Sequence, residues 1–306
     1  MIVMRVFFFL AVFFAGTAVS AAELFYCLQP TGKRAAFPET AVRTGRTHFV
    51  LDESFDGSPD ERWTAAEMAH FKRERAVLLC YLSIGEAENY RGYWRREWKR
   101  RPPAFLLAEN PRWKGNFTVR YWDKSWQEIM LKELERIARS GFDGAYLDIV
   151  DGYESFERRA GKEFTVNPAT GRTYREDMVL WVLHLAERGR AVRPGFQIFI
   201  QNGEALLADA RLLRTVDGLA VEDLFSDGGK MQPEAELQAR LKYVRLAQQA
   251  GKTCFAVEYP PAGKRGKVAA LAGKYGLDLL MTDRELKTPG VSCPVRPSRQ
   301  RHSRSQ

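Results

Sequence analysis

The feature that most constrains the fold is a series of eight short apolar segments, each with the length of a β-strand. They cover residues 24–29, 48–51, 76–84, 144–149, 196–200, 218–221, 253–257 and 277–282. Helical patterns separate most of these segments. Strands that alternate with helices pair in parallel, and eight of them close naturally into a barrel. The sequence therefore predicts an α/β fold, a single (β/α)8 TIM barrel.

The intervening segments support this prediction. Helices are expected over residues 64–75, 125–140, 174–191, 205–213, 233–250 and 264–275. Thr64 and Glu67 have the spacing of a capping box, and Gly141 suits the left-handed residue after a helix. Residues 30–47 are expected to form an irregular connection, and residues 89–123, rich in tryptophan and tyrosine, a loop over the barrel mouth. A doubly wound open sheet is the alternative, but no strand is followed by a glycine-rich phosphate loop.

Most of the predicted strands end on a carboxylate or an amide. These residues are Asp52, Glu86, Asp148, Asn202, Glu222, Glu258 and Asp283. TIM-barrel active sites lie at the C-terminal ends of the strands, so these side chains are expected to meet at one mouth. Several carboxyl groups around one opening are typical of glycoside hydrolysis, which needs a pair of them.

Asp148 and Glu222 are the best candidates for that pair. Asp148 ends the fourth strand and suits the carboxylate that attacks or stabilises the sugar. Glu222 ends the sixth strand, and alternate strands share a layer of the barrel, so it can face Asp148 as the general acid. Asp223 competes with Glu222 for that role. Asp151 is a candidate substrate contact, with a helix cap or an ion pair to arginine as the alternative.

Other polar and aromatic residues near the predicted mouth are candidates for binding sugar hydroxyls, amines and ring faces. The hydrogen-bonding candidates are Asp52, Tyr81, Ser83, Glu86, Gln201, Asn202, Glu258, Tyr259 and Asp283, and the stacking candidates include Tyr121 and Trp122. Each of them can equally be structural.

The two ends of the chain differ in composition from its body. Residues 1–22 have the charged, apolar and small-residue order of a secretory signal peptide, with an uncleaved anchor as the alternative. Residues 23–287 form the predicted barrel domain, and the basic, proline- and serine-rich residues 288–306 a disordered tail. The net charge of +9 falls to about +3 without six basic residues near the ends, which argues against a nucleic-acid surface.

The cysteines and histidines do not suggest a cofactor. Cys27, Cys80, Cys254 and Cys293 remain after processing, and three of them lie in core strands, where free buried thiols are expected. The chain has four histidines and no Cys-x-x-Cys spacing, so no zinc site is predicted. We expect neither a metal nor another cofactor.

Five segments in order resemble the secreted glycoside hydrolases related to endo-α-1,4-polygalactosaminidases. They are residues 81–91, 115–116 together with 119–123, 141–151, 201–204 and 221–225. The resemblance covers nearly the whole mature chain. It implies a (β/α)8 barrel, a catalytic pair at Asp148 and Glu222, and cleavage of α-1,4-linked galactosamine in an exopolysaccharide. The segment 84–88 departs from the characterised members, which bears on the exact sugar.

The sequence thus predicts a secreted or periplasmic glycoside hydrolase that acts on a polysaccharide. We expect a monomer with no nucleic-acid partner and no membrane association beyond the signal peptide. A polysaccharide-binding barrel without catalysis is the main alternative. A metal-dependent phosphodiesterase or deacetylase is a third, and the lack of histidine clusters counts against it.

Overall fold

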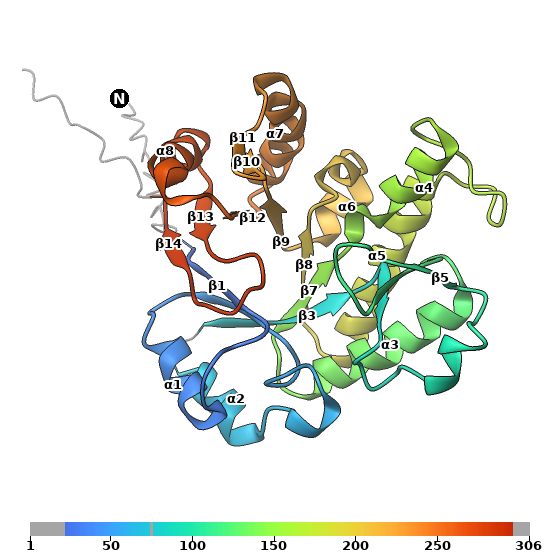
Figure 1. The fold of residues 1–306 in the computed structure, drawn as a ribbon, viewed down its shortest axis with the longest axis horizontal. Helices are drawn as coiled ribbons and strands as arrows, with labels where there is room; N and C mark the ends of the chain where they lie inside the picture. Colours follow the sequence, from blue (N-terminus) through green and yellow to red (C-terminus); the bar gives the residue numbers. More distant parts are fainter. Residues whose placement is uncertain (1–21, 74–75, 296–306) are drawn as a thin grey trace, which may run out of the picture.

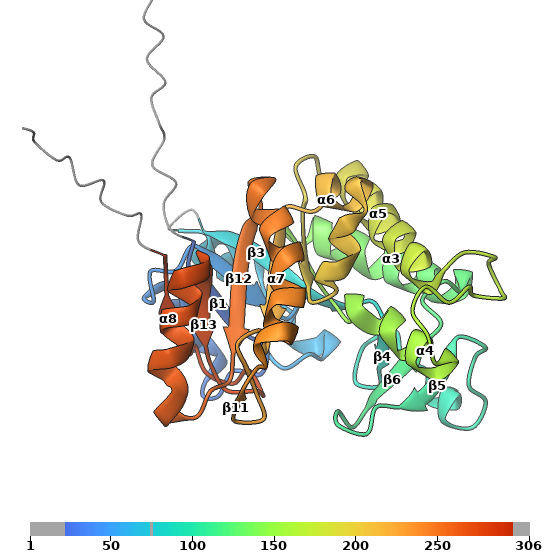
Figure 2. The ribbon, with the colours of Figure 1, turned by 90° about the horizontal axis from the view of Figure 1, so that it is seen from above.

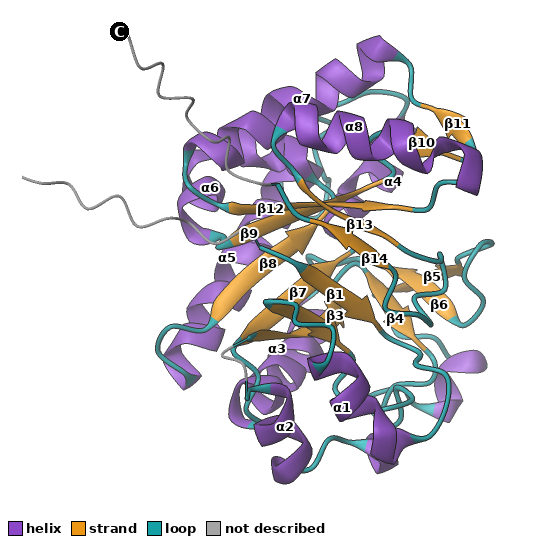
Figure 3. Ribbon diagram, turned by 90° about the vertical axis from the view of Figure 1, so that its left-hand side faces the viewer, coloured by secondary structure: helices purple, strands orange, loops and turns teal. Residues whose placement is uncertain are grey.

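A computed structural model describes residues 22–73 and 76–295. Its centre is a sheet of eight parallel strands that curves into a nearly closed barrel (Figure 3). In sheet order the strands are β1 (Leu24–Cys27), β2 (His48–Leu51), β3 (Val77–Ser83), β7 (Gly144–Asp148), β8 (Gln197–Gln201), β9 (Gly218–Glu222), β12 (Thr253–Glu258) and β13 (Asp278–Met281). The predicted TIM barrel is confirmed, and β1 lies in contact with β13 at the seam.

The strands are apolar on both faces because both faces are buried. Side chains such as Leu24, Tyr26 and Phe255 fill the barrel interior. Their neighbours Phe25 and Cys27 point outward into a second, larger core beneath the helices. Successive residues of a strand point to opposite faces, which produces this alternation.

Helices surround the barrel on its outer side (Figure 1). They are α1 (Phe37–Val42), α2 (Ala65–Phe71), α3 (Lys124–Arg139), α4 (Tyr153–Ala160), α5 (Tyr174–Val192), α6 (Ala210–Thr215), α7 (Glu234–Gln249) and α8 (Arg265–Tyr275). Short 3-10 helices are η1 (Arg34–Ala36), η2 (Pro59–Glu61), η3 (Arg96–Lys99), η4 (Val150–Gly152), η5 (Glu204–Ala208) and η6 (Ala262–Lys264). The capping box of Thr64 and Glu67 is present, and Gly141 has φ +103° after α3, both as predicted.

Two connections contain more regular structure than predicted. The link between β1 and β2 includes η1 and α1. The expected loop over residues 89–123 contains β5 (Leu106–Glu109) and β6 (Asn116–Val119), which form an antiparallel sheet with β4 (Glu86–Glu88). The tryptophans expected around the mouth partly form a core here, since Trp94 packs against Trp98 and Phe117 with ring centroids 5.2 and 5.0 Å apart.

The C-terminal boundary also differs from the prediction. Residues 291–293, assigned to a disordered tail, form β14 (Val291–Cys293), which pairs antiparallel with β13. Arg46 holds this segment, because its guanidinium donates to the carbonyl of Gly290 at 2.7 Å. A hairpin of β10 (Ser226–Asp227) and β11 (Lys230–Met231) follows β9. The rest of the predicted tail and residues 1–21 of the predicted signal peptide lie outside the described residues.

Figure 2 identifies the mouth of the barrel. The arrowhead of β12 points to the side that carries β11, α4 and the β4–β6–β5 sheet. Within the described ranges, no helix is long and apolar enough to cross a membrane. All four cysteines considered above are unpaired, and Cys27, Cys80 and Cys254 are buried, as expected.

Candidate active site

A cavity of about 390 Å³ opens at the C-terminal ends of the strands, and we call it the central cavity. Eight of the residues predicted from the sequence line it. They are Asp52, Tyr81, Glu86, Asp148, Asp151, Gln201, Asn202 and Glu222. The strands thus bring together side chains that are up to 170 positions apart in the chain.

Asp148 lies at the end of β7 with both carboxylate oxygens hydrogen-bonded. The Tyr81 hydroxyl donates to Oδ2 at 2.8 Å, and the backbone N–H of Ile149 donates to Oδ1 at 2.7 Å. The Gln201 amide donates to Oδ1 at 3.2 Å and accepts from the buried Tyr146 hydroxyl at 2.6 Å. Desolvation raises the pKa of Asp148 to about 6, although these donors favour the ionised form.

Glu222 lies at the end of β9 and has two side-chain partners. The Asn202 amide donates to Oε2 at 3.3 Å, and the Tyr259 hydroxyl donates to Oε1. Asn202 also accepts from the backbone N–H of Glu222 at 2.9 Å, which ties the ends of β8 and β9 together. Burial, and then the charge of Asp148, raise the pKa of Glu222 to about 7.

Strained backbone follows three of these strands. Ile149, Asn202 and Asp223 have φ values of 56°, 56° and 49°, in the left-handed region that side chains other than glycine rarely adopt. Ile149 and Asp223 come directly after Asp148 and Glu222. Such strain persists only where the surrounding structure enforces it, and it concentrates at functional sites.

Asp223, the rival candidate for the general acid, and Asp151, a candidate substrate contact, have different environments. Arg284 binds Asp223 through two hydrogen bonds of 2.9 and 2.8 Å, so Asp223 is engaged in an ion pair. Within the described structure, the carboxyl group of Asp151 has neither an arginine partner nor a hydrogen bond. Burial raises its pKa to about 8, and the charge of Asp148 adds to this effect.

A buried ion network forms another wall of the central cavity. Arg91 contacts Asp52 at 2.7 Å and Glu88 at 2.5 Å, and all three side chains are less than 10% exposed. Tyr90 donates to Glu88 at 2.8 Å. Glu86 accepts from the Asn110 amide at 2.9 Å, and desolvation raises its pKa. Asp52 is therefore half of a structural ion pair as well as a lining residue.

Six predicted site residues do not line the central cavity, and one of them, Tyr259, is the hydrogen-bond partner of Glu222 described above. Glu258 is fully buried, and its carboxylate accepts hydrogen bonds from the backbone of Phe225 and Ser226. Asp283 caps the loop at Lys287 and Thr288. The Ser83 hydroxyl donates to the carbonyl of Glu86 at 3.1 Å.

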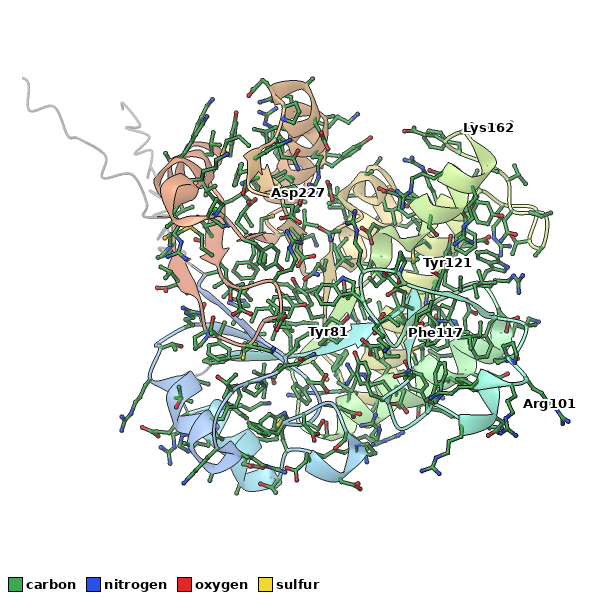
Figure 4. The ribbon with its side chains drawn as sticks, in the orientation of Figure 1. Tyr81, Arg101, Phe117, Tyr121, Lys162 and Asp227 are labelled. Carbon is green, nitrogen blue, oxygen red and sulfur yellow. The ribbon has the colours of Figure 1, made fainter. Side chains whose placement is uncertain are left out.

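The predicted stacking residues Tyr121 and Trp122 are also placed elsewhere. Tyr121 is fully buried, and its hydroxyl donates to the carbonyl of Tyr174 at 2.7 Å. Trp122 packs against Phe156 and Tyr174, with ring centroids 4.8 and 5.2 Å apart. In Figure 4, Tyr81 lies near the middle of the molecule, whereas Tyr121 lies towards α4 and the outer sheet.

Several lining residues were not predicted. Arg91 and Trp113 come from the segment between β4 and β6, Tyr26 from β1, and Arg284 from the loop after β13. Trp113 is 44% exposed. Tyr26 had a usable signal, because it alternates along β1 with the outward-facing Phe25 and Cys27.

A second cavity of about 540 Å³, here named the side cavity, adjoins the first between α4, α5 and α7. Asp151, Asn202, Glu222 and Asp223 line both cavities. The candidate acid therefore stands where the two cavities meet. In the described ranges, no cluster of three or more histidine, cysteine or acidic side chains has the arrangement of a metal site.

Comparisons with known proteins agree with this geometry. Residues 50–296 match the glycoside-hydrolase family GH114. An uncharacterised protein of Deinococcus radiodurans is 38% identical over 254 residues, which are 79% of this chain and 77% of that protein. An uncharacterised protein of Thermotoga maritima is 35% identical over 230 residues, 74% of this chain and 69% of that protein.

Two solved structures share the fold. Ega3 of Aspergillus fumigatus, in complex with galactosamine, is 17% identical with a TM-score of 0.64, over 89% of this chain and 95% of that one. The glycoside hydrolase domain of PelA from Pseudomonas aeruginosa is 17% identical with a TM-score of 0.65, over 89% and 99%. The family match spans most of the chain, so this protein belongs to glycoside-hydrolase family GH114.

Proposed function

We propose that the protein cleaves α-1,4-linked galactosamine polymers, with Asp148 as nucleophile or ion-pair stabiliser and Glu222 as acid/base. The observation that carries this proposal is the placement of both carboxyl groups on one cavity, at the ends of β7 and β9. Glycoside hydrolysis requires two such groups in opposite protonation states.

The hydrogen bonds around the pair favour this division of roles. Asp148 accepts from three donors, which stabilise a negative charge. Glu222 has the higher pKa of the two, because burial and the charge of Asp148 both oppose its ionisation. The carboxylate of Asp148 would attack or stabilise the anomeric carbon, while the acid form of Glu222 would protonate the leaving oxygen.

The charges of the cavities support a cationic substrate. The central cavity is lined by nine carboxyl groups and four basic side chains. Two of the basic groups, Arg91 and Arg284, are neutralised by ion pairs. The side cavity has seven carboxyl groups against three basic groups, and Arg240 is paired with Glu204 at 2.6 Å. A protonated amino sugar would be attracted to such a surface, and a uronic acid polymer would be repelled.

The junction of the cavities supports a polymer as substrate. Glu222 lines both cavities, so sugar units could extend on either side of the bond that it protonates. This arrangement favours cleavage inside a chain. The complex of Ega3 with galactosamine adds support by analogy, since its fold is similar. We also propose that the protein is exported, on the basis of the amino-terminal sequence.

The test compares one polymer in two chemical states. Purified protein is incubated with α-1,4-linked galactosamine polymer and with the same polymer after complete N-acetylation, and new reducing ends are counted. Release from the amine form that is lost in Asp148→Asn supports the proposal. Saturable binding of both forms without new reducing ends would instead indicate a polysaccharide-binding barrel, and preferential cleavage of the acetylated form would refute recognition of the amine.

A further inference from the structure

Arg284 makes contacts around Glu222 that neither the sequence motifs nor the proposed mechanism explain. It comes from the loop between β13 and β14. Its two terminal nitrogens bind the two carboxylate oxygens of Asp223 at 2.9 and 2.8 Å. Its guanidinium carbon also lies 4.3 Å from the centre of the Tyr259 ring, within the range of a cation–π contact.

Both partners of Arg284 act directly on Glu222. Tyr259 donates its hydroxyl hydrogen bond to Oε1 of Glu222. Asp223 is the next residue in the chain, and its negative charge raises the pKa of Glu222. Asp223 also adopts φ +49°, and its backbone N–H donates to the carbonyl of Val257 at 3.1 Å. One guanidinium therefore holds the residue that binds Glu222 and the residue that follows it.

We propose that Arg284 is a positioning residue for the acid/base Glu222. It acts by neutralising Asp223 and by holding the Tyr259 ring in place. A bidentate arginine–carboxylate pair fixes both the distance and the plane of the two groups. A lysine at position 284 would keep the charge but lose the planar fork. The proposal rests on the assignment of Glu222 as the acid/base, which is part of the proposed function.

Two cations and several acidic groups lie around Glu222. Arg240 on α7 donates to the backbone carbonyls of Glu222 and Asp223 and is paired with Glu204. Arg284 is paired with Asp223 and lies 3.7 Å from Asp227. The acidic and phenolic groups are Asp148 on β7, Asp151 in η4, Tyr146 on β7, Tyr26 on β1, Asp223 after β9 and Tyr259 after β12. Each of these acidic and phenolic groups is neutral when protonated and negative when ionised. Removal of Arg284 therefore makes the charge around Glu222 more negative.

Variants that change the charge at positions 284 and 223 should shift the pH–activity profile in opposite directions. Glu222 must be protonated to act as the acid, so its pKa sets the alkaline limb of the pH–activity profile. Arg284→Gln removes a positive charge and leaves Asp223 unpaired, which moves this limb upward by about half a pH unit or more. Asp223→Asn removes the negative charge and moves the limb downward. The double variant Asp223→Asn/Arg284→Gln returns it towards wild type.

Activity on the galactosamine polymer is measured from pH 4 to 9 for wild type, these three variants and Glu222→Gln, with Arg284→Lys and Lys287→Gln as references. Lys287 lies in the same loop and pairs with Glu285, so its replacement should leave the profile unchanged. Arg284→Lys should keep the wild-type limb with a lower kcat, because it keeps the charge without the fork. Circular dichroism confirms that each variant is folded.

The outcomes separate this inference from the proposed function. Opposite limb shifts in the two single variants, cancelled in the double variant, support the role of Arg284. An active wild type whose Arg284→Gln profile does not move refutes that role and leaves the glycosidase assignment intact. Loss of all turnover in Asp223→Asn, with Glu222→Gln still active, would make Asp223 the acid. An inactive wild type would refute the proposed function itself.

Discussion

The network of Arg91, Asp52 and Glu88 predicts a large loss of stability when its cation is removed. The Arg91 side chain is 8% exposed, and those of Asp52 and Glu88 are 5% and 4% exposed. Arg91→Gln would leave two carboxylates in the interior without a compensating charge. Removal of one partner from a buried ion pair costs about 3–5 kcal/mol. For a domain of this size, that corresponds to a fall in Tm of roughly 6–20 °C.

Urea denaturation, monitored by circular dichroism, measures this loss of stability. Arg43→Gln is the matched control, because Arg43 pairs with Glu39 on the surface and its replacement should leave the curve unchanged. The triple variant Asp52→Asn/Glu88→Gln/Arg91→Gln should recover most of the lost stability, since no buried charge remains. A loss below about 1 kcal/mol in Arg91→Gln would refute the reasoning, because it would mean that the carboxylates tolerate burial without the arginine.

Three further predictions follow from the structure. The activity should rise through about pH 6 as Asp148 ionises and fall through about pH 7 as Glu222 loses its proton, and a profile without these limbs would contradict the assigned roles. The raised pKa values of Asp148, Asp151, Glu222 and Glu258 mean that the folded state binds extra protons above about pH 4, so the free energy of unfolding, measured in urea, should fall as the pH rises from 5 to 8. A Cβ atom at Gly144 would lie 2.4 Å from the carbonyl oxygen of Gln197, so Gly144→Ala should destabilise the barrel by about 1–3 kcal/mol or more in the same assay, whereas Gly263→Ala, with open space around it, should not.

The barrel could be predicted from the sequence because its strands are buried on both faces. Continuous apolar runs such as those around Val257 and Leu147 identify such strands without reference to their neighbours. The strands β5 and β14 could not be predicted because they lack such continuous buried runs. β14 is short, partly exposed and follows Pro289 and Gly290, and β5 has only one buried residue, so neither carries a strong pattern.

The site could be predicted in part. The alternation of side chains along the strands explains which predicted residues face the cavity and which do not. Asp148, Gln201 and Glu222 each lie two residues after an inward-facing Tyr146, Phe199 or Ala220, so they continue the inner face of the barrel. Glu258 follows the inward-facing Val257 and therefore points outward. A position at the C-terminal end of a strand places a residue at the mouth of the barrel. Whether its side chain points inward or outward depends on whether it lies an even or an odd number of residues from an inward-facing neighbour on the same strand.

Other features of the site depend on contacts between distant segments. Arg91 and Arg284 come from loops, whose path is not encoded in a periodic pattern. Tyr121 and Trp122 were expected to face the mouth, but α4 and α5 offer them a core of Phe156 and Tyr174. An aromatic residue in a long loop buries its ring wherever the fold provides apolar partners.

The most direct test of the central claim is the release of reducing ends from α-1,4-linked galactosamine polymer by wild type, Asp148→Asn and Glu222→Gln, with folding verified for each. We expect turnover by the wild type and a loss of at least about a hundredfold in each variant, since each variant lacks one of the two groups that the reaction requires. Activity near the wild-type level in either folded variant would contradict this claim.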